Sequence, residues 1–111
     1  MEMNDAVHAL SALAHEGRLK AFRLLVKAGK AGMPSGEIAR TLGVPANTLS
    51  NSLTVLANAG LVESRREGKL VIYTVRFGEM TRLLGFLIED CCAASEEICA
   101  PLSDIALKSC C

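Results

Sequence analysis

Hydrophobic residues recur at helical spacing through the first part of this 111-residue chain. Within residues 4–14 and 16–28, apolar side chains return every three or four positions, which is typical of helices that bury one face. The apolar positions are Val7, Leu10 and Leu13 in the first segment and Leu19, Phe22, Leu25 and Val26 in the second. Asn4 or Asp5 can cap the first helix, and Gly29 can end the second. The pattern predicts two amphipathic helices, followed by a turn over residues 30–34.

Two shorter helices separated by a tight turn are predicted next. Ser35 is expected to cap a helix that runs through Leu42 and is ended by Gly43, and Pro45 sets the first turn of another that reaches Asn58 before Gly60. This order is the helix-turn-helix arrangement, in which the second helix enters the DNA major groove. Its buried stripe is Leu49, Leu53 and Leu56, and its outward side chains are short and hydrogen-bonding: Asn47, Thr48, Ser50, Asn51 and Thr54. Because any amphipathic helix has a polar face, this pattern alone leaves DNA binding open.

A β-hairpin is predicted directly after these helices. Residues 61–66 and 70–75 read as strands joined through Glu67 and Gly68. Arg65, Arg66 and Lys69 cluster around the tip, where cations can contact phosphates. A hairpin with a basic tip after a helix-turn-helix is typical of a wing, although a solvated basic hairpin would show the same composition.

The chain is predicted to become helical again from Gly78. One apolar stripe runs along this segment and consists of Met80, Leu83, Leu84, Leu87, Ile88 and Cys91. After a complete winged domain, we expect this stripe to pack on a partner subunit together with Val7 and Leu10 of the first helix. A two-fold homodimer would present two recognition helices to an inverted repeat in double-stranded operator DNA.

Composition fits one mainly helical domain. Half of the residues are hydrophobic but only 4% are aromatic, so the core is expected to be aliphatic. The N-terminus carries Glu2 and Asp5 and lacks the basic segment of a signal peptide. No stretch approaches the roughly 18 apolar residues of a membrane span. We therefore expect a cytoplasmic protein without a membrane partner, in a compartment where thiols stay reduced.

Charge and cysteines divide the chain into two parts. Residues 1–88 hold 11 Lys and Arg against 7 Asp and Glu, whereas residues 89–111 hold one Lys against five acids. The net charges are therefore +4 and −4, although surface variation alone can produce such a split. All five cysteines lie in the last 21 residues, at positions 91, 92, 99, 110 and 111. The net positive charge of residues 1–88 suits binding to an anionic polymer, and the acidic, thiol-rich residues 89–111 suit a soft cation.

Two stretches resemble the ArsR/SmtB family of metalloregulatory repressors. The run from Ala12 to Leu19, followed by residues 22–25, is similar to the family's second helix. Residues 48–62, together with Arg65 to Lys69 and Tyr73, are similar to its recognition helix and wing. The resemblance covers roughly residues 5–90. It implies a homodimeric winged-helix repressor that leaves its operator when a metal or metalloid binds.

Two positions depart from the family pattern. Ser52 stands where the family often has His, and residues 37–42 lack the Cys-x-Cys motif that many arsenic-responsive members carry there. Family members place inducer sites at several positions, including the end of the last helix, so the resemblance points to the C-terminal thiols. We expect residues 1–92 to form the winged helix-turn-helix DNA-binding and dimerisation domain, and residues 93–111 to form a cysteine-containing tail. The expected fold is thus mainly α with a β-hairpin wing (α+β).

Cys91, Cys92 and Cys99 are the candidate inducer ligands. Three thiolates without a nearby His suit three-coordinate As(III) or Sb(III) better than four-coordinate zinc. Cys110 or Cys111 can add a fourth sulfur, which keeps zinc, cadmium and lead open. Cys92 and Cys99 are seven residues apart, about 10.5 Å along an unbroken helix. Two sulfurs on one centre lie within about 4.6 Å, so the helix must end or bend between them.

Other interpretations of the thiols remain open. Cys91 can simply continue the apolar stripe, Cys99 can simply pack, and Cys110 and Cys111 are unassigned. A thiol redox switch would use the same cysteines, and a methylated arsenical would need only two of them. A thiol-rich metal-buffering protein without DNA binding is the distant alternative. No Cys/His/Asn arrangement or cofactor motif indicates an enzyme.

Overall fold

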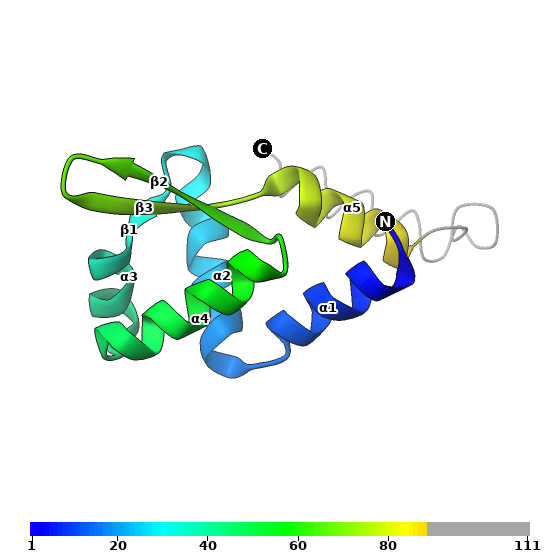
Figure 1. Ribbon diagram of the computed structural model, residues 1–111, viewed down its shortest axis with the longest axis horizontal. Helices are drawn as coiled ribbons and strands as arrows, with labels where there is room; N and C mark the ends of the chain where they lie inside the picture. The colour runs from blue at the N-terminus through cyan, green and yellow to red at the C-terminus, as the bar shows by residue number, and fades with distance from the viewer. Residues whose placement is uncertain (89–111) are drawn as a thin grey trace.

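The computed structural model describes residues 1–88, in which a small antiparallel sheet lies along one edge of a group of helices and its hairpin projects beyond them (Figure 1). The elements follow the order α1 (Met3–Leu13), α2 (Glu16–Ala28), the 3-10 helix η1 (Gly29–Ala31), β1 (Met33–Pro34), α3 (Ser35–Leu42), α4 (Ala46–Asn58), β2 (Val62–Glu67), β3 (Leu70–Val75) and α5 (Phe77–Leu87). The predicted winged helix-turn-helix architecture is confirmed, with α3 and α4 as the helix pair and the β2–β3 hairpin as the wing.

The core is aliphatic and lies where the helices meet the sheet. Its largest fully buried side chains are Leu25, Ile38, Leu53, Leu56, Leu61 and Val62. The predicted stripe of α4 is buried, with Leu53 and Leu56 fully inaccessible. The small residues of α1, which are Ala6, Ala9 and Ala12, face the core, while Val7 and Leu10 are exposed. Helix α1 therefore approaches its neighbours with a small-residue face, joined at its end by the half-buried Leu13, and keeps Met3, Val7 and Leu10 exposed.

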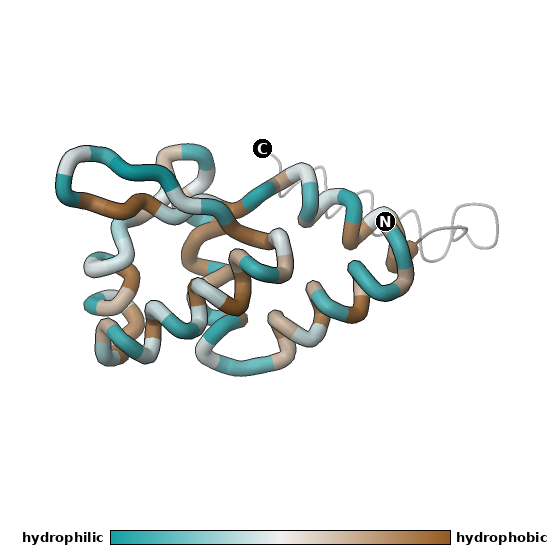
Figure 2. Tube along the Cα trace, viewed as in Figure 1, coloured by the Kyte–Doolittle hydropathy of each residue, from teal (hydrophilic) through white to brown (hydrophobic). Residues whose placement is uncertain are grey.

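The sheet has three strands, in the order β1-β3-β2, whereas the sequence pattern predicts two. Residues 30–34 are expected to be a turn, but Met33 pairs with Tyr73 and Pro34 with Ile72. A strand of two residues is too short to show the alternation of polar and apolar side chains, so it can be identified only from its pairing with β3. Figure 2 shows β3 as hydrophobic and β2 as hydrophilic, which fits β3 as the central strand and β2 as an edge.

Several predicted boundaries shift. The hairpin loop is formed by Gly68 and Lys69, because Glu67 still pairs with Leu70. Glu2 rather than Asn4 or Asp5 caps α1, and its backbone N–H donates to the Asp5 carboxylate at 3.3 Å. Helix α5 begins at Phe77, one residue before the predicted start, and the predicted continuation to Cys91 lies outside residues 1–88.

No helix within residues 1–88 has the length and apolar character to cross a membrane.

Candidate nucleic-acid interface

The turn between α3 and α4 fixes the recognition helix. Gly43 has a left-handed conformation with φ of 67° and ψ of 35°, which favours glycine. Its backbone N–H donates to Arg40 O at 3.3 Å, and that of Val44 donates to Ala39 O at 3.1 Å. These bonds close α3, and Pro45 then caps α4 from an extended conformation. The short connection holds the two helices in one orientation.

Helix α4 presents a continuous polar face to solvent. The five predicted DNA-contacting residues are all exposed: Asn47, Thr48, Ser50, Asn51 and Thr54. The hydroxyl of Thr54 donates to Ser50 O at 2.8 Å, so its proton is used inside the helix and its oxygen remains an acceptor. An asparagine amide can pair with an adenine edge through two hydrogen bonds. The exposed amides of Asn47 and Asn51 therefore have the chemistry for base recognition.

The three predicted wing cations differ in their surroundings. Arg65 Nε contacts Glu67 Oε1 at 2.9 Å, and its Nη2 donates to Ala31 O at 2.8 Å. Its Nη1 lies 3.5 Å from Lys30 O. Arg66 and Lys69 are exposed, and neither side chain forms a hydrogen bond or ion pair within residues 1–88. Arg66 and Lys69 are thus available to phosphates, whereas the Arg65 guanidinium is already engaged.

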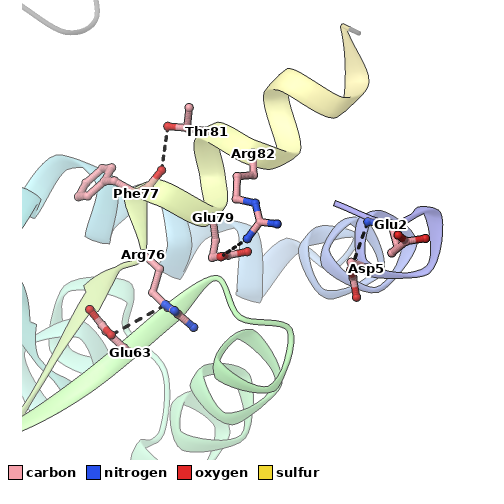
Figure 3. Close-up of polar contacts among 8 residues, drawn as sticks. All are labelled: Glu2, Asp5, Glu63, Arg76, Phe77, Glu79, Thr81 and Arg82. Atoms are coloured by element: carbon pink, nitrogen blue, oxygen red, sulfur yellow. Dashed lines mark hydrogen bonds and ion pairs between the residues drawn. The ribbon is translucent and has the colours of Figure 1, made fainter.

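A further arginine, missed from the sequence, connects the wing to the last helix. Arg76 Nε lies 3.9 Å from Glu63 Oε2, so this pair joins the residue that precedes α5 to β2 (Figure 3). Arg76 sits one residue after the apolar strand β3, and its charge alone gives no indication of this partner. The pair is solvent-exposed and is expected to contribute little to stability.

The predicted dimer stripe of α5 is only partly exposed. Leu83 is only 4% exposed and Met80 is half-buried, so both pack within the protomer. Leu84, Leu87 and Ile88 are 38–53% exposed. Leu83 and Leu87 are four residues apart and share a side of the helix, so their different exposure follows from position along α5, with Leu87 at its end. Only part of the predicted stripe is therefore available to a partner.

Helix α1, which contacts α5, also exposes large apolar residues. Val7 and Leu10 are 56% and 40% exposed, and Met3, which is absent from the predicted set, is 65% exposed. Figure 3 shows the Glu79–Arg82 ion pair on the side of α5 that faces α1. The side of α5 toward α1 is therefore charged, and we use the name α1/α5 apolar face for the exposed apolar residues that these two helices present elsewhere: Met3, Val7, Leu10, Leu84, Leu87 and Ile88.

Arg18 is also missed by the sequence pattern, and it holds α1 to α2. Its Nε donates to Ala12 O at 2.6 Å, and its Nη2 lies 3.4 Å from Ser11 O. These carbonyls belong to the last turn of α1, where a cation is favourable because helix C-termini carry partial negative charge. His15 caps α2, because its Nδ1 accepts from the Arg18 backbone N–H at 3.4 Å. Arg18 and His15 thus have structural roles at the junction of the two helices.

The candidate inducer ligands Cys91, Cys92 and Cys99 lie outside the described residues, as do Cys110 and Cys111. Within residues 1–88, no three His, Cys, Asp or Glu side chains are arranged to hold a metal ion. The boundary expected at residue 92 also falls beyond this range.

Comparison with known proteins supports the DNA-binding assignment. A family model described as a helix-turn-helix domain matches residues 13–65. The biofilm growth-associated repressor of Agrobacterium fabrum is 34% identical over 89 residues, which cover 80% of this chain and 74% of that protein. The transcriptional activator HlyU of Vibrio cholerae is 32% identical over 98 residues, which cover 86% of this chain and 88% of HlyU.

Solved structures of winged helix-turn-helix regulators are also similar to this chain. Reduced HlyU from Vibrio cholerae has a TM-score of 0.61 and 32% identity, over 76% of this chain and 88% of that one. A homodimeric winged helix-turn-helix DNA-binding domain from Mycobacterium bovis, described as a possible ArsR-family regulator, has a TM-score of 0.65 and 26% identity over 85% of this chain and 87% of that one. The chain therefore belongs to the family of winged helix-turn-helix transcriptional regulators that includes the biofilm growth-associated repressors and HlyU, and is not an enzyme.

Proposed function

We propose that this protein is a transcriptional repressor that binds an inverted repeat in operator DNA as a homodimer. The main support for DNA binding is the exposed polar face of α4. The wing of the same protomer also exposes two cations, Arg66 and Lys69. Short amide and hydroxyl side chains suit base edges, while the wing cations suit phosphates. The repressors of Agrobacterium fabrum and Xylella fastidiosa support repression as the direction of control.

The α1/α5 apolar face supports the homodimer. Its six residues are each more than a third exposed in the protomer. Two contacting helices that each expose three large apolar side chains offer apolar surface that a second protomer can cover. Because α1 and α5 lie beside each other in Figure 1, both helices can contribute to one two-fold contact. The Mycobacterium bovis domain, which has the same fold, is homodimeric.

The inducer in this proposal is As(III), with Sb(III) as a chemical equivalent. Cys91, Cys92 and Cys99 would supply three thiolates, and Cys91 follows the last residue of α5 by four positions. Because residues 92 and 99 must approach within about 4.6 Å, metalloid binding would draw residues 93–99 toward Cys91 and Cys92. This change would distort the end of α5 and alter the spacing of the two recognition helices. Operator affinity would then fall.

A redox switch is the second candidate, favoured by one finding. A structure of HlyU is specifically that of its reduced form. Disulfide formation among the same C-terminal thiols would change the end of α5 without a metalloid. The two candidates differ in their chemistry. Arsenite acts on reduced thiols, while the redox switch needs an oxidant.

DNA binding is tested by selecting duplexes from a random pool with the purified full-length protein. We expect an enriched inverted repeat, because two recognition helices should read two equivalent half-sites. Asn51→Ala should weaken binding to the enriched duplex by about 10- to 100-fold, whereas its effect on random DNA should be small. Lys69→Ala should weaken binding to both. Failure to enrich any duplex, with a folded protein, would refute the DNA-binding proposal.

The two inducer candidates are separated by measuring operator release under controlled redox conditions. Arsenite in the presence of a strong non-thiol reductant should release the operator, whereas peroxide followed by its removal should not. The opposite pattern would favour the redox switch. HlyU is named an activator, so the direction of control also needs a test. Expression of a reporter gene placed behind the selected operator would show whether the bound protein represses or activates.

A further inference from the structure

Two neighbouring arginines of the wing point to opposite faces of the sheet. Arg65 and Arg66 are consecutive on β2, and side chains alternate between faces along a strand. Arg66 pairs with Val71 on β3, while Arg65 pairs with Ile72. Directly opposite side chains of an antiparallel pair share a face, so each arginine can be located by its partner.

The face of Arg66 is the face of the recognition helix. Val71 lines a hollow of about 250 Å³ together with Ser50 and Leu53 of α4. Arg66 projects from the same side of the sheet, further along the exposed edge strand. Its position is therefore suited to a DNA duplex that also contacts α4.

The face of Arg65 is the face of the segment that joins α2 to β1. A Cβ atom added at Gly32 would lie 2.9 Å from Ile72 Cγ2 and 2.5 Å from Thr74 Cγ2, so this segment rests directly on that side of β3. Here the Arg65 guanidinium meets the carbonyl oxygens of Ala31, at 2.8 Å, and Lys30, at 3.5 Å. Glu67 is the next residue of β2 on this face, and its Oε1 lies 2.9 Å from Nε of the same guanidinium. Three separate N–H groups of one side chain are thus engaged.

From these contacts we infer that Arg65 is a positioning residue, which clamps the edge strand of the wing to residues 30–31 and is not itself a phosphate ligand. Strand β2 pairs with β3 on one side only, and its buried residue, Val62, lies at the end away from the hairpin loop, so the clamp gives the outer part of the strand a further contact with the protein body. Arg66 and Lys69 supply the wing's phosphate contacts, and Arg65 holds the hairpin where they can reach the backbone. This inference builds on the proposed DNA binding and assigns separate roles to residues that look equivalent in sequence.

The clamp is tested without DNA by amide hydrogen exchange of the full-length protein. Arg65→Ala should speed exchange in residues 29–34 and 62–67 by about three- to tenfold, because the variant cannot form the charged hydrogen bonds that hold these segments. Arg65→Lys keeps the charge but not the planar fork and should behave similarly. Arg66→Ala, the matched control, should leave exchange unchanged. Unaltered exchange in Arg65→Ala would overturn the clamp.

The role in binding is tested by the salt dependence of affinity for the selected duplex. Removing one protein–phosphate interaction reduces the steepness of log K against log salt by about 0.9, hence by about 1.8 for a dimer with two wings. Arg66→Ala should show this reduction, whereas Arg65→Ala should weaken binding by about three- to tenfold with an unchanged slope. An Arg65→Ala slope that falls as far as that of Arg66→Ala would overturn the inference. If wild-type protein binds no duplex, the DNA-binding proposal fails, and the exchange comparison still decides the clamp.

Discussion

Gly32 shows how one residue permits the sheet to form. It adopts φ of +71°, a conformation that L side chains rarely adopt. A Cβ atom at this position would lie 2.5 Å from the backbone oxygen of Tyr73. The close approach brings β1 onto β3, and it also brings residues 30–31 within reach of Arg65. The glycine is visible in the sequence, but its long-range contact is not.

We predict that Gly32→Ala destabilises the protein by about 2–4 kcal/mol, because backbone strain adds to a clash with a strand that must move. Gly29→Ala is the matched control. Gly29 has φ of 67° and ψ of −150°, against 71° and −166° at Gly32, but an added Cβ meets nothing within 4 Å. It should cost only about 1–2 kcal/mol, because it carries the backbone strain without the clash. Urea unfolding measures both, and equal destabilisation would contradict the role given to the close contact.

The acid–base behaviour of Glu16 is set by Lys20, one helical turn away. A hydrogen bond and the positive charge of Lys20, whose Nζ lies 2.9 Å from Glu16 Oε1, lower the pKa of the Glu16 carboxyl below its ordinary value. A lowered carboxyl pKa stabilises the fold at neutral pH, and that contribution is lost as pH falls through the folded-state pKa. Lys20→Ala should therefore raise the Glu16 pKa, as followed by carboxyl NMR titration. An unchanged titration curve would show that the pair does not persist in solution.

At the scale of the element, α4 combines a folding face and a recognition face. Leu53→Ala should destabilise the protein by about 2–5 kcal/mol, because the side chain is fully buried. Asn51→Ala should change stability by less than about 0.5 kcal/mol, because the side chain is exposed. Thermal unfolding measures both variants. A large destabilisation by Asn51→Ala would indicate a structural role and weaken its assignment to DNA.

The helices could be predicted because their periodic apolar residues are local signals. The two-residue strand β1 could not, because its pairing depends on Tyr73 and Ile72, about 40 positions later. The sequence also does not distinguish the inward Leu83 from the outward Leu84, since both continue one apolar stripe. For the candidate site, residue type correctly predicts that the polar residues of α4 are exposed. The charges of the three wing cations, by contrast, give no indication that the cations differ in their contacts. Their difference follows from strand register and from contacts with residues 30–31.

At the scale of the whole molecule, the wing and the dimer face occupy different ends. Figure 1 shows the hairpin tip at one end of the long axis and the N-terminal part of α1 with α5 at the other. Helix α5 follows directly from the wing strand β3, with Arg76 between them. A change at the end of α5 therefore acts on the dimer contact first. In the proposed mechanism, it reaches DNA binding through the relative placement of two protomers.

We predict that Leu87→Glu converts the dimer to a monomer, because a buried unpaired charge in an apolar contact is costly. The dimer dissociation constant should rise by roughly 100-fold or more, as measured by sedimentation equilibrium. Leu70→Glu is the matched control, since Leu70 is 52% exposed on the wing and Leu87 is 51% exposed on α5. It should leave the dimer intact. A dimer that tolerates Leu87→Glu would place the interface elsewhere.

In the proposed mechanism, reduced C-terminal thiols couple As(III) binding to operator release. The most direct measurement is an arsenite titration of the protein–operator complex under a strong non-thiol reductant, with wild-type protein beside Cys92→Ser. We expect wild type to release the operator and Cys92→Ser to remain bound, with equal operator affinity before arsenite is added. Release of Cys92→Ser at the wild-type arsenite concentration, or retention of the operator by both proteins, would contradict the account.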